Sequence, residues 1–103
     1  MTEENKILPL DGEIDLHRSP EVATTIRAAI KEEPKKLVID LSKVSYMDSS
    51  GLAVLIDGMR KVEFYGGKLY LVGLQEGLRA VFETSRLDQA FRIFPDIAAA
   101  VAA

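Results

Sequence analysis

Residues 37–41 read Leu-Val-Ile-Asp-Leu and form a nearly unbroken run of aliphatic side chains shortly after Pro34. Such a run is typical of a central strand that is covered on both faces. From about Ser49, apolar side chains recur at helical spacing, and residues 68–72 form a second apolar run. Because parallel strands need a crossover connection, a strand, a helix and a strand in this order predict an α/β fold with a mainly parallel sheet.

The chain before this run predicts one strand and one helix. Residues 6–10 predict a short strand, and Pro9 places it at a sheet edge or a strand end because proline lacks a backbone donor. Residues 11–15 predict a turn or a short extended piece. Ser19 comes directly before a proline and a glutamate, which predicts the start of a helix with Ser19 as its cap.

The chain after the run continues the alternation of strands and helices. A polar connection is expected around Ser42 and Lys43, and the two glycines at 66 and 67 are expected to end the helix that starts near Ser49. The remaining predicted elements are a helix over 75–84, a short strand over 91–94 and an Ala-rich helix after Pro95. The sequence therefore predicts a single domain over 1–103, with a four- to five-stranded, mainly parallel mixed sheet packed against about four helices.

Composition narrows the possible functions. With 48% hydrophobic and 28% charged residues, the chain is typical of a globular domain that folds alone. Its formal charge is −3, and its Lys and Arg residues are scattered among acidic neighbours, so we expect no nucleic-acid partner. No apolar run reaches membrane-spanning length, and the N-terminal residues lack the features of a signal peptide. We therefore expect a cytoplasmic protein without direct membrane insertion.

Most residues that could carry catalysis have a structural interpretation. The chain has one histidine, His17, and no cysteine, which leaves few groups for metal sites or nucleophilic dyads. We interpret His17 as a loop residue that is structural or solvent-facing. Acidic side chains near turns and helix ends are usually solvated or capping, which applies to Glu13 with Asp15 and to Glu32 with Glu33. We expect no enzyme, no catalytic residue, no cofactor and no metal.

The segment 46–52 reads Tyr-Met-Asp-Ser-Ser-Gly-Leu and stands at the start of the strongest predicted helix. Capping by Asp48 or Ser49 explains one of these residues. It does not explain why Ser49, Ser50 and Gly51, all poor helix formers, occupy the first turn. The functional interpretation is a phosphorylation switch, because the amides and the dipole at a helix N-terminus can accept a phosphate while the fold is retained.

The sequence from residue 38 to residue 52 closely resembles the signature of bacterial STAS-domain anti-sigma factor antagonists. Other elements of that family are matched by Gly12-Glu13-Ile14-Asp15, by Gly67-Lys68-Leu69 and by the closing segment with Leu87-Asp88 and Phe91-Arg92-Ile93. The resemblance extends from about Leu10 to the end of the chain. It implies the STAS fold.

The resemblance also implies a partner switch. In that family the unphosphorylated antagonist binds an anti-sigma factor that is also a serine kinase, here expected to be of the GHKL type. Phosphorylation releases the partner, and a serine phosphatase resets the switch. By position the phosphoacceptor is Ser49, and Asp15, Asp48, Ser50 and Gly51 share the partner-binding surface with it.

The chain departs from the family at its start. Family members usually have one more N-terminal strand, and few residues are available here to supply it. This departure leaves open which sheet edge is exposed and whether a second copy pairs there. The shortened start also resembles that of STAS subunits of lipid-transport ABC systems. The alternative to a phosphorylation switch is therefore a constitutive regulatory subunit in which Ser49 only caps the helix. Nucleotide binding is a third, weaker hypothesis, because the sequence has no phosphate-binding loop.

Overall fold

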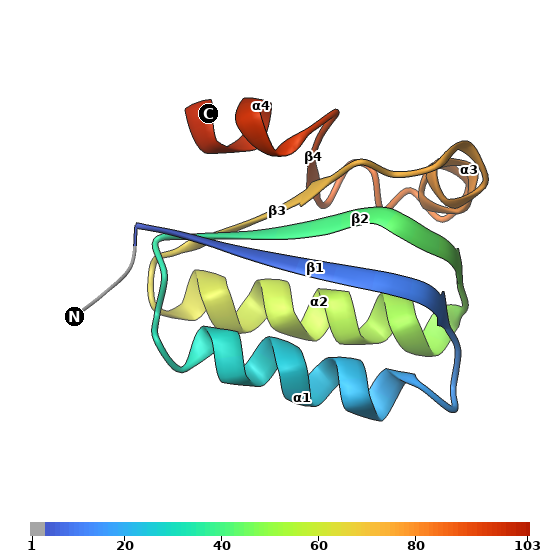
Figure 1. The fold of residues 1–103 in the computed structure, drawn as a ribbon, viewed down its shortest axis with the longest axis horizontal. Coiled ribbons are helices and arrows are strands. Elements are labelled where there is room, and N and C mark those ends of the chain that lie inside the picture. The colour runs from blue at the N-terminus through green and yellow to red at the C-terminus, as the bar shows by residue number, and fades with distance from the viewer. Residues whose placement is uncertain (1–3) are drawn as a thin grey trace.

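A computed structural model of the protein describes residues 4–103, which form one four-stranded sheet and four helices (Figure 1). The strands lie in the order β1-β2-β3-β4, and all three neighbouring pairs are parallel. The expected α/β fold is confirmed, with every strand pair parallel. The elements in chain order are β1 (Asn5–Ile14), α1 (Ser19–Ile30), β2 (Lys36–Met47), α2 (Ser49–Phe64), β3 (Lys68–Val72), α3 (Glu76–Thr84), β4 (Arg92–Phe94) and α4 (Ile97–Ala102).

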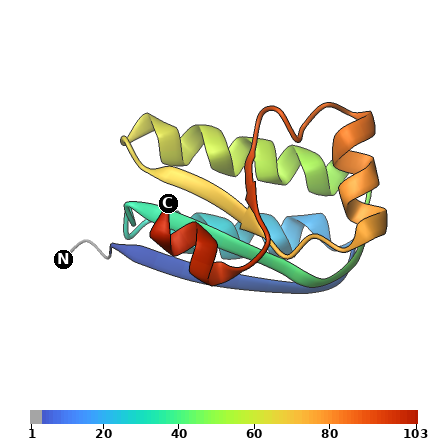
Figure 2. The same cartoon turned by 90° about the horizontal axis from the view of Figure 1, so that it is seen from above.

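The helices cover the two faces of the sheet unequally. The long helices α1 and α2 lie side by side against one face, and the short α4 lies against the other (Figures 1 and 2). Helix α3 stands near the end of the sheet where α1 and α2 begin (Figure 2). This arrangement places the starts of α1 and α2 together at one end of the molecule and their C-termini at the other.

The core lies mainly between the sheet and α1 with α2. Leu37, Ile39 and Leu41 alternate along β2 and belong to this larger cluster, and each is 0% exposed. Val38, which points to the opposite face, is also 0% exposed and packs with Tyr70, Val72 and Ala100 beneath α4. The prediction of a strand that is covered on both faces is therefore confirmed.

Both long strands extend farther than the sequence predicted. β1 continues through residues 11–14, which were expected to form a turn or a short extended piece, and β2 continues through Ser42 and Lys43. The extensions support each other, because Asp11 pairs with Lys43 and Gly12 with Val44. The register between β1 and β2 shifts twice, between Pro9 and Asp11 and between Gly12 and Glu13, and Gly12 has a φ of 71°. These irregularities allow residues 11–14 to remain paired with β2. As expected from Pro9, β1 is an edge strand.

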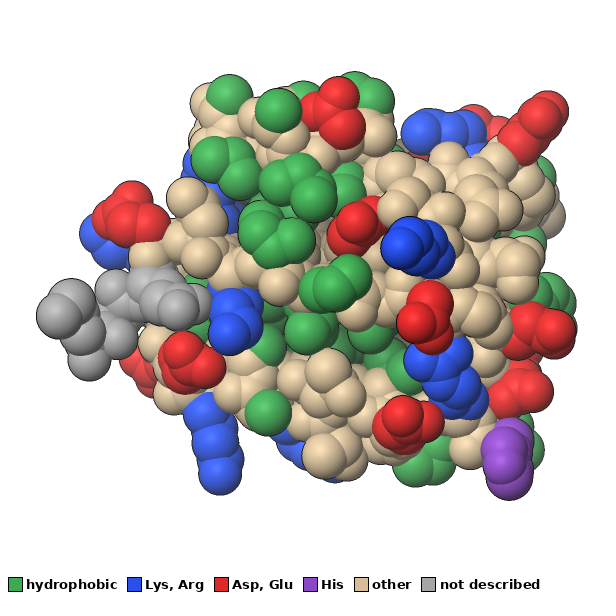
Figure 3. Space-filling model, viewed as in Figure 1, with side chains coloured by type: hydrophobic (Ala, Val, Ile, Leu, Met, Phe, Trp, Pro, Cys, Tyr) green, Lys and Arg blue, Asp and Glu red, His purple; other side chains and the backbone are tan. Residues whose placement is uncertain are grey.

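The face seen in Figure 3 carries exposed side chains of several kinds. Hydrophobic side chains gather near α4 and β1, where Ile7, Ile97 and Val101 are partly exposed (Figure 3). The single histidine lies at the surface in the turn after β1, so the interpretation of His17 as a solvent-facing loop residue is confirmed (Figure 3). None of the helices in the described part of the chain is long and apolar enough to cross a membrane.

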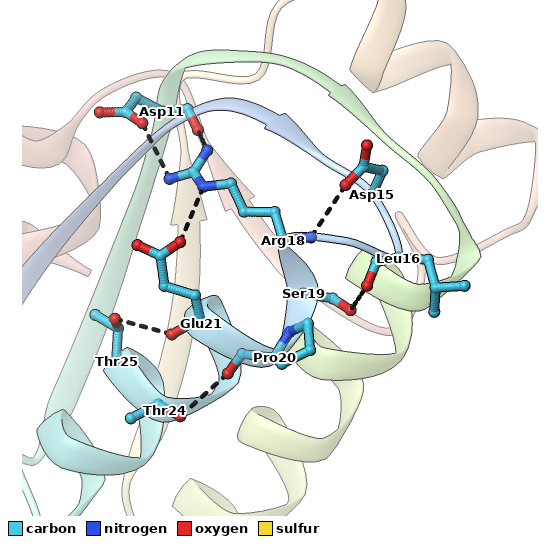
Figure 4. A network of polar contacts seen from close by, with 9 residues as sticks. All are labelled: Asp11, Asp15, Leu16, Arg18, Ser19, Pro20, Glu21, Thr24 and Thr25. Carbon is cyan, nitrogen blue, oxygen red and sulfur yellow. Dashed lines mark hydrogen bonds and ion pairs between the residues drawn. The ribbon is translucent and has the colours of Figure 1, made fainter.

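Helix α1 begins where predicted, but Ser19 is not its cap. Ser19 is the first helical residue, it is 6% exposed, and its hydroxyl donates to the Leu16 carbonyl at 3.4 Å. The residue before it, Arg18, donates its backbone N–H to the Asp15 carboxylate at 3.0 Å (Figure 4). The prediction of Ser19 as the cap is wrong because Ser19 already lies inside the helix, where its hydroxyl points back to the preceding turn and its amide donates to the Asp15 carbonyl at 2.8 Å.

The remaining boundaries agree with the sequence predictions. Helix α2 starts at Ser49, and Gly66, at a φ of 88°, follows its end. β3, α3 and β4 fall within one residue of their predicted starts. The last helix, α4, is capped by Asp96, whose carboxylate accepts from the Ala99 amide at 2.9 Å.

Candidate functional site at the start of helix α2

The start of α2 is organised by Asp48, which ends the β2–α2 connection. One carboxylate oxygen of Asp48 accepts from the Ser50 amide at 2.9 Å and from the Gly51 amide at 3.3 Å. The same oxygen accepts from the Ser50 hydroxyl at 2.5 Å. The sequence left open whether Asp48 or Ser49 caps the helix, and the structure assigns the cap to Asp48.

Asp48 also joins this helix start to the turn between β1 and α1. Its second carboxylate oxygen accepts from the Leu16 amide at 3.1 Å, and its own amide donates to the Ile14 carbonyl at 3.2 Å. Residues 32 to 34 positions apart in the sequence are thereby held side by side. Asp15, which lies between Ile14 and Leu16, is placed at the same end of the molecule as Ser49.

The charge of Asp48 is stabilised by these contacts. The Ser50 hydroxyl, and then the amides of Gly51, Ser50 and Leu16, lower the pKa of Asp48 below its ordinary value, and partial desolvation opposes them. Because the pKa of Asp48 is lower in the folded state, its ionised carboxylate stabilises the folded protein fully at pH values above the unfolded-state pKa. That contribution is lost as the pH falls through the folded-state pKa.

We expect Asp48→Asn to lower the free energy of unfolding at neutral pH and to lower it less as the pH falls below the ordinary pKa of an aspartate. Asn is itself a good helix cap. The difference in the free energy of unfolding between the two proteins therefore reports the negative charge of the Asp48 carboxylate and not the loss of a cap. Urea unfolding of both proteins across this range measures the effect. Asp88→Asn is the control, because the exposed Asp88 side chain makes no hydrogen bond within residues 4–103. An Asp48 effect that does not depend on pH would contradict the assignment.

The three small residues of the first turn have three different environments. Ser49 is exposed, and its hydroxyl has no hydrogen-bond partner among the described residues. Ser50 is half-buried with its hydroxyl bound to Asp48. Gly51 is buried, and a Cβ there would lie 3.0 Å from both the Ile14 carbonyl oxygen and Ile14 Cγ2. Of these three residues, only Ser49 therefore offers a free hydroxyl to an approaching protein.

Asp15 lies in the turn that Asp48 holds against α2. It is half-buried, and its side chain accepts from the Arg18 amide (Figure 4). The Arg18 side chain in turn contacts Asp11 and Glu21. The structure therefore places all five predicted site residues at one end of the molecule. Ser49 is their exposed member, whereas Asp15, Asp48 and Ser50 are partly occupied with local hydrogen bonds and Gly51 is buried.

Two exposed hydrophobic residues at this end were missed by the sequence reasoning. Leu16 is 74% exposed in the turn that Asp48 holds, and Tyr46 is 49% exposed near the end of β2. The signal for Leu16 was its place between Asp15 and His17, where an apolar side chain has no helical or strand pattern to bury it. Large apolar side chains on a rigid polar surface are typical of protein-binding sites.

The fold and the site together define a class of protein. It is a small, parallel α/β domain that presents a free serine hydroxyl at the capped start of a helix, beside a rigid turn. Within residues 4–103, no group of three or more acidic or histidine side chains is arranged to hold a metal ion. The family model of the STAS domain matches residues 1–100, and the chain belongs to this family.

Curated relatives are consistent with this assignment. The chain is similar to an anti-sigma-B factor antagonist of Listeria monocytogenes, with 35% identity over 82 residues that cover 80% of this chain and 72% of the relative. It is also similar to an anti-sigma F factor antagonist of Lysinibacillus sphaericus, with 33% identity, 84% coverage of this chain and 75% of the relative. The resemblance to anti-sigma factor antagonists is confirmed.

Solved structures give the same fold. An anti-sigma factor antagonist from Mycobacterium paratuberculosis superposes with a TM-score of 0.87 at 27% identity, over 99% of this chain and 86% of that one. The phosphorylated form of the Bacillus cell fate determinant SpoIIAA superposes with a TM-score of 0.68 at 27% identity, over 93% and 87% of the two chains. The STAS fold predicted from the sequence is therefore confirmed.

Proposed function

We propose that this protein is an anti-sigma factor antagonist that binds an anti-sigma factor when Ser49 is unmodified and releases it when Ser49 is phosphorylated. The observation that carries the proposal is the free, exposed Ser49 hydroxyl at the start of α2. The relatives named as anti-sigma factor antagonists support the same partner class. The SpoIIAA structure described as phosphorylated supports the same kind of modification.

A phosphate on Ser49 suits the local chemistry of the helix start. It would sit at the first helical residue, where backbone amides and the helix dipole favour negative charge. It would also add a charge of about −1.5 to −2 beside the Asp48 carboxylate. The fold can therefore persist while the electrostatic potential of this surface changes.

We propose that the partner contacts the end of the domain formed by Asp15, Asp48, Ser49 and Ser50, with Leu16 as an exposed apolar contact. Gly51 belongs to this site in a different way. Because Gly51 has no side chain, the first turn of α2 can approach Ile14 closely, and this contact helps to position Ser49 beside the turn. The proposed surface is rigid because Asp48 binds both the turn and the helix.

The proposed partner is an anti-sigma factor that is also a serine kinase of the GHKL type. A serine phosphatase is proposed to restore the unmodified state, and the cytoplasm is proposed as the compartment. In this scheme the domain acts as a substrate and a ligand and catalyses no reaction itself.

The proposal is tested by incubating the protein with ATP and its cognate serine kinase and then measuring the intact mass. We expect wild type to gain one phosphate, Ser49→Ala to gain none, and Ser50→Ala to gain one. The Ser50 variant is the matched control, since its hydroxyl is bound to the Asp48 carboxylate. Modification of Ser49→Ala would contradict the assigned site. A variant that keeps full cellular function without phosphate would favour the constitutive transporter-type subunit.

A further inference from the structure

The end of the molecule opposite Ser49 carries a groove that the proposed switch does not use. Ser49 and Phe64 are the first and last residues of α2, which places them about 22 Å apart along the helix axis. An open groove of about 570 Å³ lies between the last turns of α1 and α2. It adjoins a narrower groove of about 250 Å³ farther along the two helices, and both are lined by Arg27, Ile30 and Lys61. The larger groove has the size of a small-molecule site.

The surface that lines the larger groove is mostly apolar. Phe64 lines it and is 93% exposed, more than any other large hydrophobic side chain in the described part of the chain. Ile30 and the Tyr65 ring are half-buried beside it, and the Tyr65 hydroxyl donates to the Pro34 carbonyl at 2.7 Å. A single exposed hydrophobic residue needs no explanation, but a phenyl ring that adjoins an apolar groove offers surface for a ligand to cover.

The rim of the groove is cationic although the chain as a whole carries a formal charge of −3. Four cationic side chains line it against one carboxylate, that of Glu33. Arg27 and Lys61 have local roles, because each lies in the last turn of its helix and Lys61 pairs with Asp57 at 2.7 Å. Lys31 and Arg60 form no ion pair with any of residues 4–103. These two charges are therefore available to an anionic ligand.

The narrower groove gives the site an elongated shape. Three small residues are part of its lining, and at one of them, Gly58, the two helices approach so closely that a Cβ would lie 3.1 Å from Ile26 Cγ2. Ala23, Ala53 and Val54 line the groove beside this contact, and the two opposite charges of Asp57 and Lys61 pair with each other. An apolar chain can lie along this groove while an anionic head stays at the larger, cationic one.

We propose that the grooves bind a free, monomeric anionic amphiphile, with a carboxylate head beside Lys31 and Arg60 and an unbranched hydrocarbon chain against Phe64 and Ile30. Charge complementarity selects an anionic head, and the contiguous apolar grooves select a linear chain. This site is separate from Ser49 and does not depend on the proposed phosphorylation switch. It gives the domain a second input at the far end of α2.

The probe for this site is decanoate, kept below its micelle concentration and followed through the backbone amide signals of the 103-residue protein by NMR. We expect saturable shifts at Lys31, Arg60, Phe64 and Tyr65, and none at Ser49. Acetate tests the head alone, and decyltrimethylammonium tests a chain with the opposite charge; both are expected to bind at least about tenfold more weakly. Chemical shifts that change linearly with decanoate concentration and never reach a plateau would overturn the proposal. Binding of the cationic probe as tightly as decanoate would also overturn it.

Variants test the same site independently. Arg60→Glu and Phe64→Ala are each expected to weaken decanoate binding about tenfold, whereas Arg79→Glu, on the exposed surface of α3, leaves it unchanged. All three proteins are expected to gain phosphate at Ser49 as wild type does, so failure of this site is distinguishable from failure of the switch. Equal loss in the Arg60 and Arg79 variants overturns the proposal. Binding to phosphatidylglycerol vesicles without binding to monomeric decanoate also overturns it, in favour of a membrane surface.

Discussion

Ser49→Asp is expected to weaken binding of the anti-sigma factor about ten- to a hundredfold, which corresponds to about 1.4 to 2.8 kcal/mol of binding free energy. The new carboxylate adds a second negative charge beside Asp48, and a charge that binding removes from water without giving it an opposite charge costs affinity. The melting temperature should remain close to that of wild type, because an acidic side chain is favourable in the first turn of a helix. Calorimetric titration of the purified partner and a thermal melt measure the two quantities.

Ser49→Asn is the matched control for this variant. Asn has nearly the shape of Asp but no charge, so it separates electrostatic repulsion from steric exclusion. We expect Asn to weaken binding much less than Asp, and we expect added salt to narrow the gap because it screens exposed charges. Equal losses of affinity for the two variants would show that the size of the side chain at position 49 controls binding and that its charge does not. Unchanged binding for both would remove Ser49 from the partner surface.

Gly51→Ala is expected to lower the free energy of unfolding by about 1 to 3 kcal/mol, the usual cost of overpacking a core. The added Cβ would lie 2.5 Å from Met47 Cγ and 3.0 Å from the Ile14 carbonyl oxygen. The Met47 side chain can move, but the Ile14 carbonyl is fixed by its hydrogen bond from the Asp48 amide. The strain is therefore expected to reach the switch site. Urea unfolding measures the loss of stability, and partner binding measures its consequence.

Gly77→Ala is the control for this prediction. Gly77 lies in α3, and a Cβ there meets no atom within 4 Å. Replacing a helical glycine by alanine in open space is expected to stabilise the protein by up to about 1 kcal/mol. The two substitutions are chemically identical and are expected to have opposite signs. A stabilising Gly51→Ala would contradict the close contact between α2 and β1.

The sequence reasoning was accurate where one local interaction decides the structure. The aliphatic run at 37–41, the helix that starts at Ser49 and the glycine stop at Gly66 were all predicted, because periodicity and turn chemistry act over a few residues. It was less accurate at residues 11–14, expected as a turn or a short extended piece, and at Ser42 and Lys43, expected as a polar connection. Those residues belong to long strands because β1 and β2 pair with each other from Asn5 to Ile14. Pairing between segments about 30 residues apart leaves no local pattern.

The candidate site divides in the same way. The residue types in the segment Asp48-Ser49-Ser50-Gly51 marked the helix start, and the family resemblance selected Ser49 as the phosphoacceptor. The sequence by itself thus determined the fold class, the family and the candidate residue. Only the tertiary structure decided that Asp48 is the cap, that Ser49 has the free hydroxyl, and that Leu16 stands exposed beside it. Those outcomes depend on how close β1, the following turn and α2 come in space, and the order of residues along the chain does not state such distances.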